Sequence, residues 1–178
     1  DLNRDEDHEM VEHAQIHLVR GHATLTKKTG DEHVIDVTGT DGTIVQVRAA
    51  HVGISTGSLP VQFPIKGLDQ ERVLTNEPVF ELSAVPAKTV MVGGGVASME
   101  MATAFRDLGG DVHIVELADR VMGNDDPLVS STIQAALEAR GVVFHIGTSI
   151  VHFEGTTAHL GDGTTIDDVD KVLLAIGR

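Results

Sequence analysis

The residues best suited to chemistry are the glycines Gly93-Gly94-Gly95, which follow an apolar run and precede Val96-Ala97-Ser98. Gly93 permits a tight turn. Gly95 lets the backbone approach a pyrophosphate, whose charge is met by free N–H groups at a helix N-terminus. The third small position of such loops is usually Gly or Ala, and here it is Ser98. Taken alone, the pattern indicates either a dinucleotide-binding loop or a plain tight turn.

A carboxylate lies at the interval that such a loop requires. Glu116 ends the next apolar run, 21 positions after Gly95, close to the roughly 20-residue spacing of the acid that binds the adenosine ribose. A carboxylate there accepts hydrogen bonds from the ribose of NAD and repels the 2′-phosphate of NADP. Arg120 lies nearby and weakens that preference. The alternative interpretation of Glu116 is a solvated glutamate at a strand end.

Other polar residues are weaker candidates. The ten histidines are scattered and lack the spacing of metal ligands. Asp125-Asp126 is typical of a helix N-cap rather than of a metal site. Glu100 fits a solvated helix position, and periodicity does not decide its role. We therefore expect no metal site in this chain.

Composition excludes several functions. The chain has no Cys, so it has no disulfide, thiolate site or cysteine nucleophile, and it is expected to be cytoplasmic. It has no Tyr, which a short-chain dehydrogenase needs. The net charge of −14 argues against nucleic-acid binding and against an anionic membrane surface. No apolar stretch approaches the length of a membrane span.

The elements that must position the glycine loop alternate in type. Apolar runs at 89–92, 112–115, 142–146 and 172–176 predict strands. Helices are expected after Gly95, with Met101, Ala102, Phe105 and Leu108 on one face, and after Asp126-Pro127, with Val129, Ile133 and Leu137 as a stripe. Asp162-Gly163 predicts a hairpin. Alternating strands and helices indicate an α/β fold, a Rossmann-like parallel sheet with helices on both faces.

The first part of the chain has a different pattern of predicted elements. A charged, largely helical lead-in is expected over residues 7–15. Four strand-like runs follow, at 17–25, 33–37, 44–49 and 52–56, separated by glycine- and aspartate-containing turns, which predicts a β-meander. Four of the five prolines then fall between residues 57 and 86, where we expect a domain junction.

Several motifs together resemble one family. Ser55-Thr56-Gly57-Ser58-Leu59-Pro60, Pro64-Ile65-Lys66-Gly67-Leu68-Asp69, the glycine loop through Glu100, and Leu174-Ala175-Ile176-Gly177-Arg178 are similar to motifs of the pyridine nucleotide–disulfide oxidoreductases. That family includes dihydrolipoamide dehydrogenase, glutathione reductase and mercuric reductase. A methyltransferase would share the loop and the acid, but not the motifs that bracket them.

The resemblance implies an architecture and two cofactors, FAD and NAD. Residues 1–75 would be a partial, β-rich FAD-binding domain, and residues 76–178 the NAD-binding domain. By resemblance, the FAD contacts are Ala23, Thr56, Gly57 and Ser58. The positions that contact or border NAD are Gly93, Gly94, Gly95, Val96, Ala97, Ser98, Glu100, Glu116, Ile150 and Gly177.

The same resemblance implies missing partners. The family's cysteine pair and first FAD motif would precede this segment, and its second FAD motif and dimerisation domain would follow. We therefore expect a fragment of an NAD(P)H–disulfide oxidoreductase with a homodimeric parent, inactive by itself and without catalytic residues of its own. The alternatives are a stand-alone nucleotide-binding module and a fragment of a related flavoprotein NADH oxidase.

Overall fold

The computed structural model describes residues 16–61, 63–76 and 78–177, and the chain divides into two compact units, Asp1–Gly57 and Ser58–Arg178. The helical lead-in expected over residues 7–15 lies outside the described residues. The division between units falls earlier in the chain than the junction expected between residues 75 and 76. Which part serves which cofactor stays a prediction.

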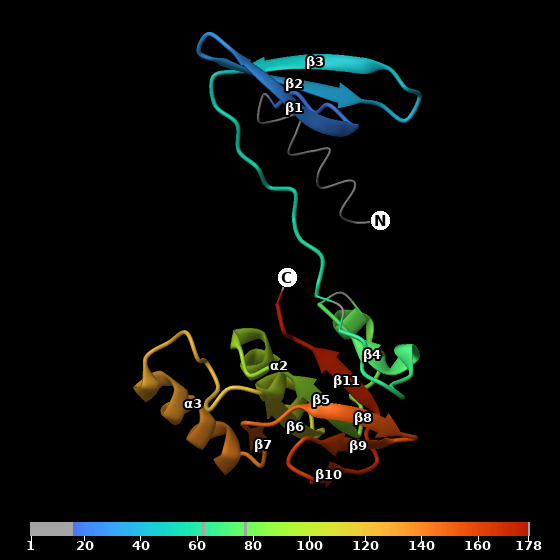
Figure 1. The fold of residues 1–178 in the computed structure, drawn as a ribbon, viewed down its shortest axis with the longest axis vertical. Helices are drawn as coiled ribbons and strands as arrows, with labels where there is room; N and C mark the ends of the chain where they lie inside the picture. Colours follow the sequence, from blue (N-terminus) through green and yellow to red (C-terminus); the bar gives the residue numbers. More distant parts are fainter. Residues whose placement is uncertain (1–15, 62, 77, 178) are drawn as a thin grey trace. The chain divides into compact units, whose positions relative to one another are not determined.

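The first unit contains an antiparallel meander. β1 (His22–Thr29), β2 (Glu32–Thr38) and β3 (Ile44–Ala49) pair in chain order, as the turn residues predict (Figure 1). Val34 and Val37 of the central strand are buried. The fourth expected strand, at 52–56, is wrong: this segment is exposed and pairs with no strand among the described residues. Its composition suits a strand, but a strand also needs a partner.

The second unit is built on a parallel sheet. Its five strands run in the order β4-β11-β5-β6-β7. They are β4 (Val73–Leu74), β5 (Lys88–Val92), β6 (Asp111–Glu116), β7 (Val143–Ile146) and β11 (Lys171–Leu174). The chain moves outward from β5 to β7 and then returns to the other side of β5 with β11. The point of reversal therefore lies between β5 and β11, where open α/β sheets bind ligands beyond the carboxyl ends of their strands.

Alternate residues of the parallel strands serve two cores. Met91, Ile114 and Leu173 point to the side where helices α2 (Val96–Asp107) and α3 (Pro127–Ala139) pack. Val90, Val115 and their neighbours point to the opposite side, against an antiparallel sheet. That sheet consists of β8 (Ile150–Glu154), β9 (Thr157–Leu160) and β10 (Thr165–Ile166).

The Rossmann-like parallel sheet is thus confirmed, with one correction. Both described helices of the second unit belong to one core, and strands β8–β10 cover the other face (Figure 1). A twisted antiparallel sheet can bury an apolar face as a helix does. The β9–β10 hairpin turns at Asp162-Gly163 as predicted, with the Gly163 N–H bonded to the Leu160 carbonyl at 3.1 Å.

The ends of the helices follow their capping residues. Asp126 caps α3 by accepting the Leu128 N–H at 2.8 Å, and Pro127 opens the helix, as predicted. Leu108 does not join the buried face of α2, because the helix ends at Asp107 and Leu108 is 67 % exposed. Val129 is also exposed.

Ser130 takes the place of Val129 in the inward stripe of α3. Its hydroxyl donates to the Val121 carbonyl at 2.6 Å. The hydrogen bond allows a small polar residue to be buried there, which a hydrophobic pattern does not reveal.

Short elements complete the second unit. Two 3₁₀ turns, η1 (Gln70–Arg72) and η2 (Pro78–Glu81), flank β4. Val79 of η2 is buried in the core under α2. Among the described residues, no helix has the length and apolar character to cross a membrane.

Candidate dinucleotide site

The glycine loop connects β5 to α2 at the carboxyl edge of the parallel sheet. Gly93 has φ 97°, and a Cβ there would stand 2.7 Å from the Ala175 carbonyl oxygen, so only glycine fits. The Ser98 hydroxyl donates to the Gly93 carbonyl at 2.5 Å. Ser98 is itself fully buried. The serine therefore satisfies its hydroxyl within the loop, which explains why it can replace the usual Gly or Ala.

Gly95 borders open space. It is the N-cap of α2, and a Cβ placed on it would meet no atom within 4 Å. The first helical bond runs from the Met99 N–H to the Gly95 carbonyl at 3.2 Å. The N–H groups of the residues between them have no partner within the helix. They form an anion-binding end with room in front of it, which suits a pyrophosphate.

Glu116 ends β6 beside this loop. Its Oε2 accepts the Gly94 N–H at 2.5 Å, and its Oε1 accepts the Ala118 N–H at 2.7 Å. Each carboxylate oxygen has a further lone pair, so the group can still accept a ribose hydroxyl. The carboxylate is thus held in a fixed place at the strand end rather than free in solvent.

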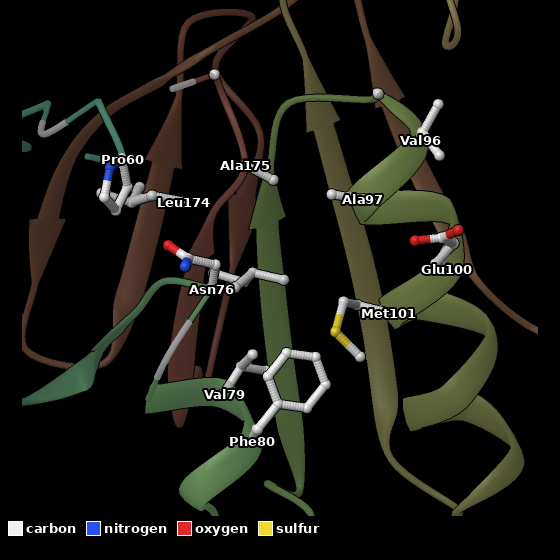
Figure 2. Close-up of a pocket in the computed structure, with 13 residues that line it drawn as sticks. Pro60, Asn76, Val79, Phe80, Val96, Ala97, Glu100, Met101, Leu174 and Ala175 are labelled. Atoms are coloured by element: carbon white, nitrogen blue, oxygen red, sulfur yellow. The ribbon is translucent and has the colours of Figure 1, made fainter. Parts of the chain in front are cut away.

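A pocket opens on the other side of the glycine loop, at the reversal point of the sheet. It has a volume of about 480 Å³. Val96, Ala97, Glu100 and Met101 of α2 line one side of it, and Asn76, Leu174 and Ala175 line the other side (Figure 2). The lining is mainly apolar. The remaining lining residues are Pro60, Val79, Phe80, Gly95, Leu173 and Gly177.

Two polar side chains interrupt this apolar lining. Glu100 is exposed on α2, and Asn76 is partly buried on the loop before η2. The Asn76 Oδ1 is buried and has no hydrogen-bond partner among the described residues. A buried amide oxygen without a partner is costly. Because this oxygen is buried, it does not itself face a ligand in the pocket.

The structure brings many of the predicted NAD residues to one edge. The glycine loop, the start of α2 and Glu116 adjoin one another, and Gly177 lines the pocket with Glu100. Ile150 lies apart from the pocket lining, because it is the first residue of β8 and is buried in the core on that face of the sheet. It comes two residues after Thr148, whose N–H donates to the Glu116 carbonyl at 3.2 Å. Direct contact of any of these residues with NAD stays a prediction.

The predicted FAD residues are all exposed, and their contact with FAD stays a prediction. Ala23 is exposed in β1, and Thr56, Gly57 and Ser58 lie in an exposed segment without regular structure. Sequence reasoning did not select Asn76, Val79, Phe80 or Met101 for the site. Of these, only Met101 had a predicted place, on the inner face of a helix. Leu174 and Ala175 stood within a quoted motif, which was the signal for them.

A second polar cluster lies on β6 and β7. His113 Nδ1 and His145 Nε2 are 3.1 Å apart and their rings stack, with Asp111 3.6 Å from His113 Nε2. Burial lowers the pKa of both histidines, and Asp111 only partly opposes this for His113. Within the described part of the chain, no group of three His, Asp or Glu residues could hold a metal ion.

Comparisons with known proteins show the family of this chain. The family described as pyridine nucleotide-disulphide oxidoreductase matches residues 4–178. Dihydrolipoamide dehydrogenase of Chaetomium thermophilum is 31 % identical over 185 residues, which is 90 % of this chain and 36 % of the relative. Dihydrolipoyl dehydrogenase of Bacillus subtilis is 32 % identical over 168 residues, 92 % of this chain and 36 % of the relative.

A solved structure shares the fold. LpdA from Mycobacterium tuberculosis superposes with a TM-score of 0.79 at 25 % identity, covering 97 % of this chain and 39 % of that chain. The chain therefore spans little more than a third of the length of the relatives it matches.

Proposed function

Because this chain belongs to the pyridine nucleotide-disulphide oxidoreductase family, whose members are flavin-dependent oxidoreductases that use FAD and NAD(H), we propose that its second unit is the NAD-binding part of such an enzyme. The observation that carries the proposal is the glycine loop. It places the N-terminus of α2 in front of open space at Gly95, between the Glu116 carboxylate and an apolar pocket.

Each of three parts of the dinucleotide would contact its own set of residues. The N–H groups at the start of α2 would hold the pyrophosphate. Glu116 would accept hydrogen bonds from the adenosine ribose and oppose a 2′-phosphate. The pocket beyond Val96 would take the nicotinamide, which supplies or accepts a hydride when bound.

The pocket residues fit a heterocycle that carries an amide. Val79, Phe80 and Met101 provide apolar contact and exclude water around the ring. Asn76 lines the pocket with an uncharged amide, a group that can hydrogen-bond the carboxamide of nicotinamide. Glu100 stands at the mouth on α2, where its negative charge favours the oxidised, positively charged ring.

The whole enzyme's properties are part of the proposal. We expect the electrons to pass to FAD and then to a disulfide in a homodimeric, cytoplasmic parent protein, with the remainder of the FAD domain and a dimerisation domain supplied from outside these residues. A related flavoprotein NADH oxidase would use the same dinucleotide site with a different final acceptor.

Titration of the purified chain with NADH and with ADP-ribose tests the adenosine-ribose part and the nicotinamide part of the site separately. Glu116→Ala should weaken both ligands roughly 10- to 100-fold, because one charge-assisted hydrogen bond is worth about 1.5–3 kcal/mol. Asn76→Ala should weaken NADH alone, by about 10-fold, because ADP-ribose lacks the nicotinamide. If the unchanged chain binds neither ligand, the proposal fails.

A further inference from the structure

The loop from Leu117 to Asp126 contains one cation, Arg120, beside the site proposed for the adenosine ribose. A cation at this place would be a natural ligand for the 2′-phosphate of NADP. The geometry points to another role. We propose that Arg120 is a positioning residue that folds this loop onto the glycine loop, and that its guanidinium group is therefore not available to a 2′-phosphate. This inference rests on the proposed function.

The guanidinium group of Arg120 is committed to its own loop. Nη1 donates to the Met122 carbonyl at 3.2 Å and to the Asp125 carbonyl at 3.0 Å, and Nη2 donates to the Gly123 carbonyl at 2.6 Å. Both terminal nitrogens of the planar guanidinium group thus donate to loop carbonyls, three in all, and the group is directed into the loop. Turning it toward a nucleotide would break all three bonds.

The bonds to Arg120 hold Met122 in an unfavourable conformation. Met122 has φ 51°, in the left-handed region that long side chains rarely adopt. In this conformation its N–H donates to the Gly94 carbonyl at 2.8 Å. Its neighbour Val121 is fully buried. The loop therefore reaches the glycine loop through a backbone bond that depends on a strained residue.

Both the carbonyl and the N–H of Gly94 are hydrogen-bonded to neighbouring segments. Its carbonyl accepts from Met122, and its N–H donates to the Glu116 carboxylate. A Cβ on Gly94 would stand 2.8 Å from a Val121 methyl group, so the two loops are in close contact. The position of the glycine loop is thus fixed jointly by Glu116 and by the loop that Arg120 folds.

The charges around this loop oppose a phosphate. Asp119, Asp125 and Asp126 accompany Arg120, and Glu116 precedes them. With the guanidinium group occupied by carbonyls, the surroundings of the ribose site are acidic. We therefore expect discrimination against NADPH to come from Glu116 and these acids, and Arg120 to affect NADH and NADPH equally.

The test compares dissociation constants of NADH and NADPH for Arg120→Met and Arg120→Lys, each with Glu116 intact and in Glu116→Ala. Arg120→Met should weaken both nucleotides by about 5- to 20-fold and leave their ratio within about twofold in either background. Arg120→Lys should recover part of the loss, since an ammonium group can still donate to the carbonyls.

Arg140→Met is the matched control. Arg140 caps the far end of α3, where its side chain pairs with Asp107, so its loss removes the same charge without touching the loop. It should change neither constant by more than about twofold. Hydrogen exchange of the Met122 amide should be faster in Arg120→Met than in the unchanged chain. This measurement identifies a loosened loop even if the variant also has a lower melting temperature.

Two results would overturn the inference. One is an Arg120→Met variant that loses NADPH affinity at least 10-fold more than NADH affinity in the Glu116→Ala background, which would make Arg120 a phosphate ligand. The other is a variant with unchanged affinity for both nucleotides. Either result leaves NADH binding by the unchanged chain intact, so it differs from failure of the proposed function.

Discussion

Replacement of Gly95 by valine separates binding from folding at this site. Gly95 has φ −81° and ψ −176°, which any residue can adopt, and its added side chain would meet no protein atom within 4 Å. The same side chain would occupy the space in front of the helix N-terminus. We therefore expect a folded variant that does not bind NADH.

The magnitude follows from the bonds that the valine would block. A hydrogen bond to a charged group is worth about 1.5–3 kcal/mol, so loss of two N–H contacts to a pyrophosphate weakens binding by roughly two to four decades. The cost to stability is the poorer N-cap, about 1 kcal/mol, or a Tm lower by about 2–4 °C for a chain of this size.

Two matched variants complete the experiment. Gly53→Val places the same side chain in open space on the first unit and should bind NADH normally. Gly93→Val should lose stability as well as binding, because Gly93 has a positive φ and its Cβ would stand 2.7 Å from the Ala175 carbonyl oxygen. Binding is followed by NADH fluorescence and folding by circular dichroism. Normal NADH affinity in folded Gly95→Val would refute the argument and leave the loop a structural turn.

Three further expectations concern stability and activity. Thr89→Val should raise the free energy of unfolding of the second unit by about 1–2 kcal/mol, because the buried Thr89 hydroxyl has no partner among the described residues. The control is Thr103→Val, which removes a hydroxyl bonded to the Met99 carbonyl and should not raise the free energy of unfolding. Burial lowers the pKa of His113 and His145 below 6.5, so the unfolded chain takes up protons first as the pH falls. The free energy of unfolding should therefore decline from about pH 7 through 6.5 and below. A free energy of unfolding that rises as the pH falls over this range would contradict this expectation. Finally, the purified chain mixed with FAD, NADH and lipoamide should not oxidise NADH above the free-FAD background, because the glycine loop is already assigned to NAD rather than FAD and no cysteine is present to pass electrons to lipoamide. Sustained turnover would contradict this expectation.

Local patterns in the sequence determined most of the second unit's elements. The apolar runs at 89–92 and 112–115 became β5 and β6 because a strand buried on both faces needs continuous apolar residues. Asp126-Pro127 marked the start of α3 because capping depends on adjacent residues alone. Glu116 could be placed beside the glycine loop, since consecutive parallel strands end at one edge.

Only the tertiary structure decided what covers the sheet and what completes the site. Strands β8–β10 were identified from the sequence only in part, and their docking on the second face depends on contacts between distant residues. Asn76 had no local signal, because its proposed role comes from its place in the pocket lining with Leu174, which only folding creates. Arg120 could not be assigned from spacing, which places a cation near the ribose but does not show that loop carbonyls already hold it. Sequence patterns record each residue's own preference, whereas hydrogen-bond partners and shared cavities arise only when separate segments meet.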